Sequence, residues 1–90
     1  MSNRTQRVTA TDIARGRVRI PSVSKHLFPG ERAYIDVRLR GTHLNPRWDP
    51  RFGPPERSGT IGVGRELLPA LVQPDEVLSI HRDGDILVLD

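Results

Sequence analysis

Glycine and proline interrupt this chain at short intervals, which limits the length of any helix or strand that it can form. Eight glycines and eight prolines are spread over 90 residues. Glycine adopts positive φ angles readily and proline lacks a backbone N–H donor, so both residues favour turns over the interior of regular elements. The sequence therefore predicts many short elements joined by tight turns, which is typical of a β-rich fold.

Residues 33–39 carry the clearest strand signal. Ala33, Ile35, Val37 and Leu39 alternate with tyrosine, aspartate and arginine. A period of two residues is that of a strand with one buried face. We expect these four side chains to share one core with the apolar positions of the other strands.

Several further segments are expected to form strands. Alternation resumes in residues 59–64, and Asp83-Gly84 between two apolar runs is a strong signal for a β-hairpin. The remaining strands are expected at residues 7–10, 17–20 and 43–48, with 77–81 and 86–89 as the two strands of the hairpin.

Helical segments are expected to be few and short. Thr11 is a suitable N-cap for a single helical turn over residues 12–15, which Gly16 would end. A second short helix is expected over residues 23–28. The apolar stripe in residues 65–72 predicts a third, which a proline within it keeps short.

Together these elements predict a mainly β fold with short helices (α+β) and about six or seven strands. A small closed or partly closed barrel accommodates so many short strands better than an open sandwich. Ninety residues suffice for one modest core. We therefore expect a single domain over residues 7–90, preceded by a flexible tail over residues 1–6.

Cysteine usage and hydropathy narrow the protein class. The chain contains no cysteine, so disulfides and thiolate metal sites are excluded. Residues 1–12 contain no apolar run, so we expect no signal peptide, and no apolar stretch approaches the length of a membrane span. The expectation is a cytoplasmic protein with no membrane contact.

The distribution of charge is strongly asymmetric. Residues 1–58 contain twelve Lys and Arg against five Asp and Glu, whereas residues 59–90 contain two against six. The formal net charge of +3 conceals this difference. A basic region focuses positive potential towards a polyanion, so the asymmetry favours a nucleic-acid partner.

The first basic segment covers residues 9–19. Arg15, Arg17 and Arg19 occupy every second position, so a strand here would direct all three to the same side. The intervening Val18 would face the core. This pattern predicts a row of guanidinium groups on one face of an edge strand.

The second basic segment covers residues 45–58, where three arginines are interleaved with two aromatic residues: Arg47, Trp48, Arg51, Phe52 and Arg57. Arginine suits both phosphate and the paired acceptors of guanine, because its guanidinium is a planar fork. Asn45 could read adenine by the same bidentate geometry. Trp48 has two interpretations, either a core anchor at the end of its strand or a base contact.

Catalysis finds little support in the sequence. The three histidines lie in different elements without a triad partner, and Asp83 and Asp85 are explained by turn formation. The glycines of residues 59–64 are not followed by the lysine or long helix of a phosphate-binding loop. We expect no enzyme activity, no metal and no small-molecule cofactor.

The order of these elements resembles the DNA-binding pseudobarrel family, which includes plant B-three transcription-factor domains and the effector-binding domains of certain restriction endonucleases. The resemblance covers residues 7 to 89 and rests on short motifs. These are Thr11-Asp12-Ile13, Gly16-Arg17-Val18-Arg19 followed by Ile20-Pro21, His26-Leu27-Phe28-Pro29, a central strand pair with tryptophan between Ile35 and Trp48, and Pro74-Asp75-Glu76-Val77-Leu78 before the last hairpin.

The resemblance implies that the protein grips the major groove of double-stranded DNA with two arms, residues 11–19 (the N-terminal arm) and residues 45–58 (the C-terminal arm). The residues expected to contact DNA are Thr11, Arg15, Arg17, Arg19, Asn45, Arg47, Trp48, Arg51, Arg57 and Ser58. A sequence-specific transcriptional regulator or a recognition module of a restriction-type system would fit this implication, alone or with other protein subunits.

Two other functions remain open at this point. A basic face could bind an acidic partner protein instead of DNA. Single-stranded RNA is a further alternative, because Tyr34, Trp48 and Phe52 could stack bases. These three aromatic residues lie in different elements, which disfavours a stacking platform.

Overall fold

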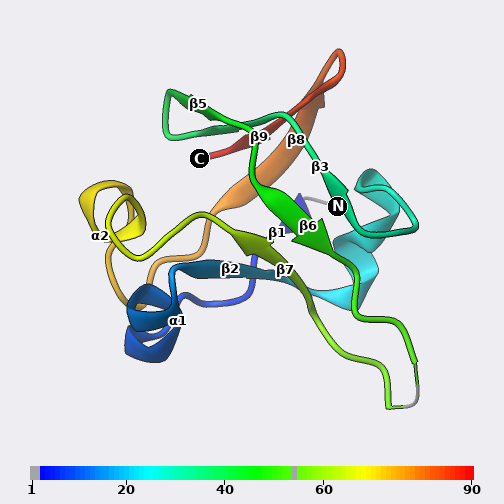
Figure 1. The fold of residues 1–90 in the computed structure, drawn as a ribbon, viewed down its shortest axis with the longest axis horizontal. Helices are drawn as coiled ribbons and strands as arrows, with labels where there is room; N and C mark the ends of the chain where they lie inside the picture. The colour runs from blue at the N-terminus through cyan, green and yellow to red at the C-terminus, as the bar shows by residue number, and fades with distance from the viewer. Residues whose placement is uncertain (1–2, 54) are drawn as a thin grey trace.

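The computed structural model describes residues 3–53 and 55–90, and these form a mainly β fold with three short helices (Figure 1). In the order of their pairing, sheet A contains β1 (Asn3–Arg4), β8 (Ser79–Asp83), β9 (Ile86–Leu89), β4 (Val37–Leu39) and β5 (Thr42–Leu44). Sheet B contains β2 (Arg17–Ile20), β7 (Gly59–Gly62), β6 (Arg47–Asp49) and β3 (Ala33–Tyr34). The helices are α1 (Ala10–Arg15), the 3₁₀ helix η1 (Ser22–Leu27) and α2 (Leu68–Leu71).

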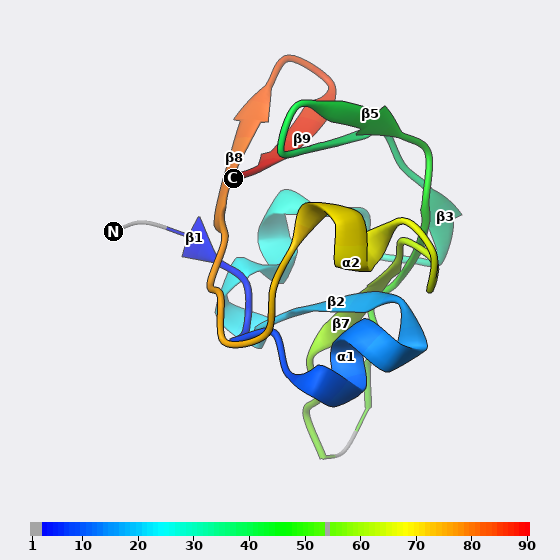
Figure 2. The ribbon, with the colours of Figure 1, turned by 90° about the vertical axis from the view of Figure 1, so that its left-hand side faces the viewer.

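The two sheets differ in strand direction. Sheet B is antiparallel throughout, whereas β4 and β9 of sheet A run parallel, with Val37 opposite Leu87 and Leu39 opposite Leu89. In Figure 2, strands β8, β9 and β5 lie above β2 and β7, with α2 at the height between them and α1 below β2. The mainly β class with short helices, predicted from the sequence, is confirmed.

The described residues form nine strands instead of six or seven, because two predicted strands cross from one sheet to the other. Residues 33–39 divide into β3 and β4, and the segment predicted as the strand 43–48 divides into β5 and β6. The Ile35 N–H donates to the Pro46 carbonyl at 3.0 Å where both segments cross, and proline cannot donate in return. The molecule is two joined sheets, so of the closed or partly closed barrel that was predicted, the closed form is wrong.

The N-terminal residues that the structure describes are part of the fold, in contrast to the tail predicted over residues 1–6. Asn3 and Arg4 form β1 and pair with β8. The Gln6 N–H donates to the Arg19 carbonyl at 2.9 Å, which joins this segment to sheet B. Residues 1 and 2 lie outside the described part of the chain.

Helix α1 begins two residues earlier than predicted, because Thr9 and not Thr11 is its N-cap. Thr9 Oγ1 accepts a hydrogen bond from the Asp12 N–H at 3.1 Å, and the Asp12 carboxylate accepts one from the Thr9 N–H at 3.0 Å. This reciprocal capping box satisfies two backbone donors at the helix start. Gly16 ends the helix with φ of 66°, as predicted.

Residues 7–10 do not form the predicted strand. Val8 is buried, and its backbone bonds to the turn before β8: its N–H donates to the Glu76 carbonyl and its carbonyl accepts from the Asp75 N–H. Ala10 already belongs to α1. The segment therefore connects β1 to α1 by packing against residues 75–76, without joining a sheet.

The other two helices are as short as the sequence indicates. Residues 22–27 form a 3₁₀ helix, and α2 occupies only four residues of the predicted 65–72 because Pro69 stands at its beginning. At the end of α1, the backbone of Gly16 packs closely against the segment that precedes α2. A Cβ placed on Gly16 would lie 2.3 Å from the Gly64 carbonyl carbon. Only glycine permits this backbone approach at positive φ.

The hydrophobic core lies between the sheets and is centred on Trp48. The apolar positions predicted from strand alternation are buried, apart from the half-buried Ala33 and Val63: Ile35, Val37, Leu39, Ile61, Leu78, Ile80, Leu87 and, at the last predicted position (Val88 or Leu89), Leu89. The Trp48 ring stacks on Phe28 with 4.4 Å between centroids, and its Nε1 donates to the Pro29 carbonyl at 2.9 Å. Both the apolar body and the polar N–H of the indole are therefore satisfied internally.

Candidate nucleic-acid interface

The pairing of sheet B brings the two predicted basic segments onto one face. Arg17 of β2 lies opposite Gly62 of β7, Gly62 lies opposite Arg47 of β6, and Arg47 lies opposite Tyr34 of β3. Residues directly opposite each other across strands share a face of the sheet. Two arginines from distant parts of the sequence thus flank a glycine, with an exposed tyrosine beside them.

A second row on this face runs beside the first. Arg19 lies opposite Thr60, and Thr60 lies opposite Asp49. The Asp49 carboxylate is 3.4 Å from Nε of Arg32, which precedes β3. We call the surface formed by both rows the outer face of sheet B; its residues are Arg17, Arg19, Arg32, Tyr34, Arg47, Asp49, Thr60 and Gly62.

The opposite face of sheet B is apolar and buried. Val18, Ile61 and Trp48 occupy one row across β2, β7 and β6, and each is 0% exposed. Trp48 therefore cannot contact a base, and its prediction as a DNA-binding residue is wrong because strand alternation points it inward. The alternative interpretation, a core anchor, is the one that the structure shows.

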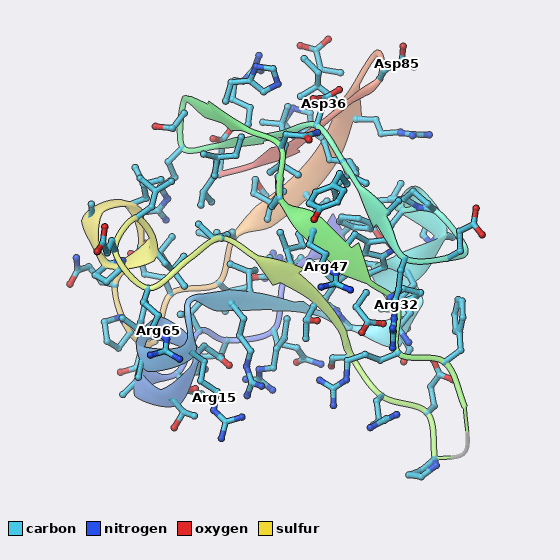
Figure 3. The ribbon with its side chains drawn as sticks, in the orientation of Figure 1. Arg15, Arg32, Asp36, Arg47, Arg65 and Asp85 are labelled. Atoms are coloured by element: carbon cyan, nitrogen blue, oxygen red, sulfur yellow. The ribbon has the colours of Figure 1, made fainter. Side chains whose placement is uncertain are left out.

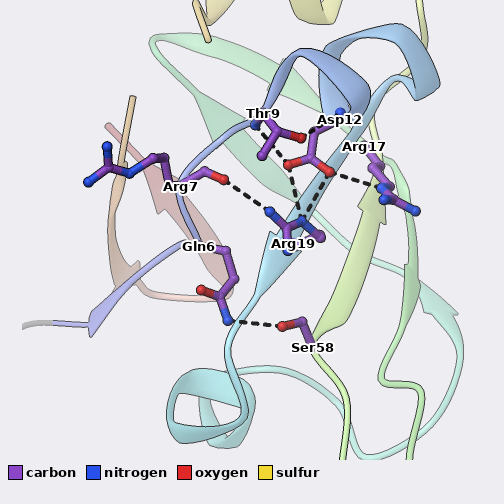
Figure 4. Close-up of polar contacts among 7 residues, drawn as sticks. All are labelled: Gln6, Arg7, Thr9, Asp12, Arg17, Arg19 and Ser58. Atoms are coloured by element: carbon purple, nitrogen blue, oxygen red, sulfur yellow. Dashed lines mark hydrogen bonds and ion pairs between the residues drawn. The ribbon is translucent and has the colours of Figure 1, made fainter. Parts of the chain in front are cut away.

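Arg17 and Arg19 converge on one buried carboxylate (Figure 4). Nε of each arginine lies 3.0 Å from Oδ1 of Asp12, and Nε of Arg19 is also 3.1 Å from Oδ2. The terminal Nη2 of Arg19 donates to the Arg7 carbonyl at 3.1 Å. The Asp12 side chain is only 1% exposed, whereas both arginine side chains remain 28% exposed.

The protonation state of Asp12 follows from these contacts. Burial alone raises the pKa of a carboxyl group, but the Thr9 N–H and the Arg17 and Arg19 guanidinium groups bond the carboxylate and hold the pKa of Asp12 below its ordinary value. Asp12 is therefore a carboxylate at neutral pH. Two of the arginines predicted to face DNA have a structural partner that sequence reasoning missed.

Arg15 does not share a strand with Arg17 and Arg19, which corrects the predicted row of three. It lies in the last turn of α1, exposed, and Figure 3 shows it near Arg65. Within the described residues, no carboxylate lies within ion-pair distance of Arg15 or Arg65. Arg65 lies beside the predicted N-terminal arm, because a Cβ placed on Gly16 would be 2.5 Å from the Arg65 backbone nitrogen; the sequence indicated nothing of this.

The segment after β6 carries the other predicted arginines, Arg51 and Arg57. Its two ends are held in place: the Arg51 N–H donates to Asp49 Oδ1 at 3.0 Å, and Glu56 accepts from Lys25 Nζ at 2.9 Å and from Ser22 Oγ at 3.1 Å. These contacts fix the ends of the segment to β6 and to η1.

Phe52 of the same segment is exposed, and the Lys25 Nζ lies 4.9 Å from its ring centroid. This distance is within the range of a cation–π contact. Phe52 therefore contacts a lysine of η1 and does not lie on sheet B.

Shallow hollows adjoin one another along the outer face of sheet B. One is lined by Arg32, Arg47, Asp49, Thr60 and Gly62, and its neighbours add Tyr34, Asn45, Arg51 and Arg57. Gly62 contributes no side chain between Arg17 and Arg47. The arrangement is a broad cationic depression, unlike the enclosed apolar pocket of a small-molecule site.

The three other residues predicted to contact DNA lie in different segments of the structure. Thr11 is exposed on α1, Ser58 is half-buried and its Oγ accepts from the Gln6 side chain at 3.0 Å, and Asn45 donates to Asp36 Oδ1 at 3.3 Å. Asn45 still borders the hollow beside Tyr34 and Arg47. Ser58 directly precedes β7 and is bonded to the Gln6 side chain, and nothing in its contacts indicates a ligand.

Arg32 and Thr60 belong to the outer face of sheet B but were not predicted, and Tyr34 was predicted only as a base-stacking residue of the RNA alternative. Tyr34 is 72% exposed and stands at a polar position of the alternating segment 33–39, which was the available signal. Its pairing with Arg47 is between residues far apart in sequence, so local pattern could not place the two side by side.

Two arginines in or beside β4 of sheet A have carboxylate partners, in contrast to Arg47 of sheet B. Arg38 lies 3.6 Å from Asp83, and Arg40 forms an ion pair with Glu76. On the outer face of sheet B, among the described residues, Arg47 has no carboxylate partner. Figure 3 shows Asp36 and Asp85 at one end of the molecule, Arg32 and Arg47 near its middle, and Arg15 and Arg65 towards the other end.

Among the described residues, no three histidine, aspartate or glutamate side chains are grouped so that they could hold a metal ion. Likewise, none of the described helices has the length and apolar character needed to cross a membrane. Comparison with family models, with curated proteins and with solved structures finds no match to this chain.

Proposed function

We propose that the protein binds double-stranded DNA through the outer face of sheet B, without catalysing a reaction. The observation that carries the proposal is the register Arg17–Gly62–Arg47, which collects arginines of both basic segments on one open, cationic surface. Lysine and arginine contacts to phosphate supply most of the affinity of such interfaces.

The dimensions of this surface suit a duplex. Arg17 and Arg47 are two strands apart, which corresponds to roughly 10 Å between their Cα atoms. Arg15 and Arg65 extend the basic surface at one end, and Arg51 and Arg57 extend it at the other. The surface can therefore contact phosphates on both sides of a major groove about 12 Å wide.

The exposed aromatic residues favour a duplex over a single strand. Single-strand binders stack successive bases on several aromatic side chains. Of the aromatic residues described, Trp48 is buried, Phe28 is stacked on it, the exposed Phe52 lies outside sheet B beside Lys25, and only Tyr34 stands on the outer face of sheet B. One ring is too few for a stacking platform.

The proposal includes the resemblance to the DNA-binding pseudobarrel family. In that interpretation the N-terminal arm contributes β2 and the C-terminal arm contributes β6, two strands of one sheet with only β7 between them. A transcriptional regulator or a recognition module of a restriction-type system would act in this way, with chromosomal DNA in the cytoplasm as its setting.

The test is a titration of the purified protein with a fluorescently labelled duplex, with the corresponding single-stranded DNA and with single-stranded RNA. We expect the duplex to bind most tightly, and log K to fall linearly with log salt between about 50 and 200 mM, by about 0.9 per phosphate contact. Efficient displacement of the duplex by the RNA would favour a single-strand binder. Absence of binding to all three at low salt would favour an acidic protein partner.

A further inference from the structure

The two arginines of β2 differ in what they leave available to a ligand. A guanidinium has five N–H donors. Arg19 uses Nε on both oxygens of Asp12 and Nη2 on the Arg7 carbonyl. Arg17 uses only Nε, on Asp12 Oδ1, and its two terminal nitrogens have no hydrogen-bond partner among the described residues.

Asp12 is well placed to hold the Arg17 side chain in one orientation. Its carboxylate is 1% exposed and is itself fixed by the Thr9 N–H at 3.0 Å and by the helix that it caps. An arginine bonded through Nε keeps the opposite end of its planar fork free for a second partner. Restricting a flexible side chain before binding lowers the entropy lost on binding.

The space in front of Arg17 is open. The residue opposite it on β7 is Gly62, which has no side chain, and the next residue in the row is the exposed Arg47. A group above Gly62 can thus be approached by Arg17 from one side and by Arg47 from the other.

We propose, resting on the proposed function, that Arg17 is a ligand-binding residue oriented by Asp12, whereas Arg19 is a structural residue that does not contact the ligand. The free end of the Arg17 fork is a site for two neighbouring acceptor atoms. In a duplex these are two oxygens of one phosphate or the O6 and N7 atoms of a guanine.

Side-chain nuclear magnetic resonance tests this division in the wild-type protein. The Nε–H resonances of Arg17 and Arg19 are followed during titration with a duplex and, separately, with inorganic phosphate. We expect both additions to shift the Arg17 resonance and to leave that of Arg19 nearly unchanged.

Every other outcome is informative. Binding of the duplex without a shift at Arg17, or with an equal shift at Arg19, would overturn this inference and leave the proposed function standing. A shift at Arg17 with phosphate but no duplex binding would support the site and overturn the proposed function. No shift at Arg17 with either addition would overturn the inference.

Matched substitutions separate the two sources of acceptors. Arg17→Lys keeps the charge but loses the fork. If the partner is a phosphate, Arg17→Lys should retain the salt dependence of duplex binding. If it is a guanine, the variant should lose about 5- to 150-fold on the preferred duplex and its preference at one G·C pair.

Asp12→Asn tests the positioning role, because it weakens the hold on Arg17 without removing the arginine. We expect weaker duplex binding under conditions where the variant is folded, and no additional loss when Asp12→Asn is introduced into a protein that already carries Arg17→Gln. Arg19→Gln is the neighbouring comparison: it should lower stability and weaken duplex binding less than Arg17→Gln does. Equal losses of affinity in folded Arg17→Gln and Arg19→Gln would contradict the proposed division.

Discussion

Gly59 lies against the six-membered ring of Trp48 so closely that a Cβ at Gly59 would be 2.2 Å from Trp48 Cη2. Phe28 also stacks on the Trp48 ring, and the Trp48 Nε1 donates a hydrogen bond to the Pro29 carbonyl, so the ring has little freedom to move. Gly59→Ala should therefore lower the free energy of unfolding by about 1–3 kcal/mol through overpacking. Denaturant titration measures this.

Gly30→Ala is the matched control for that substitution. A Cβ there meets no atom within 4 Å. We expect a change within about 0.5 kcal/mol, as at other surface positions. A Gly59→Ala protein as stable as the Gly30→Ala protein would contradict the packing described around Trp48.

The buried carboxylate of Asp12 makes stability depend on pH in the acid range. Its pKa is lower in the folded protein than the ordinary value of 3.8, because the hydrogen bonds from Thr9, Arg17 and Arg19 outweigh the effect of burial. A lowered pKa means that the contribution of Asp12 is fully present above the ordinary value and is lost as the pH falls through the folded-state pKa. The free energy of unfolding should fall on acidification below about pH 4.

Comparison with Asp12→Asn isolates this contribution. The pKa of Glu56 is lowered by hydrogen bonds from Lys25 and Ser22, and that of Glu76 chiefly by Arg40, so both add to the acid dependence in the same direction. The Asp12→Asn variant should be less stable at neutral pH by about 1.5–3 kcal/mol, the value of hydrogen bonds to a charged group. Its acid dependence should be shallower; an unchanged dependence would contradict the assignment.

The fluorescence of Trp48 tests which face of β6 is buried. It is the one tryptophan of the chain and is completely buried. Iodide should therefore not quench its fluorescence in the native protein and should quench it in urea. Strong quenching of the native protein would mean that Trp48 faces solvent and that the outward and inward faces of sheet B are exchanged.

The local sequence pattern was enough to predict elements that pair with a neighbour close in sequence, and strands in which apolar and polar residues alternate. The hairpin of β8 and β9 turns at Gly84 as its Asp-Gly signal indicated, and β2 has the predicted bounds of residues 17–20. Alternation in residues 33–39 predicted which side chains are buried. It could not show that the chain changes sheets at Ile35, because alternation specifies a face but not a partner strand.

The site was predictable in composition but not in arrangement. The arginines of β2 and β6 are prominent in the sequence, yet their adjacency depends on β7, which lies between them in sheet B and contributes Gly62. Asp12 precedes Arg19 by seven residues and could have been noticed as its counterion. Its burial depends on the capping box with Thr9, whereas the sequence suggested Thr11 as the cap.

The central claim, that the outer face of sheet B is the DNA-binding surface, is tested most directly by comparing Arg47→Gln with Arg82→Gln. Both arginines are exposed strand residues without an ion pair among the described residues, but Arg47 lies on sheet B and Arg82 on the β8 hairpin of sheet A. The two variants have the same net charge. Salt-dependent titration with one labelled duplex compares them directly.

We predict that Arg47→Gln weakens duplex binding and makes the slope of log K against log salt shallower by about 0.9, the value for one lost phosphate contact. Arg82→Gln should leave that slope unchanged, and both proteins should unfold at the wild-type denaturant concentration. Equal losses of affinity and slope in the two variants would contradict the claim, because binding would then follow overall charge instead of the outer face of sheet B.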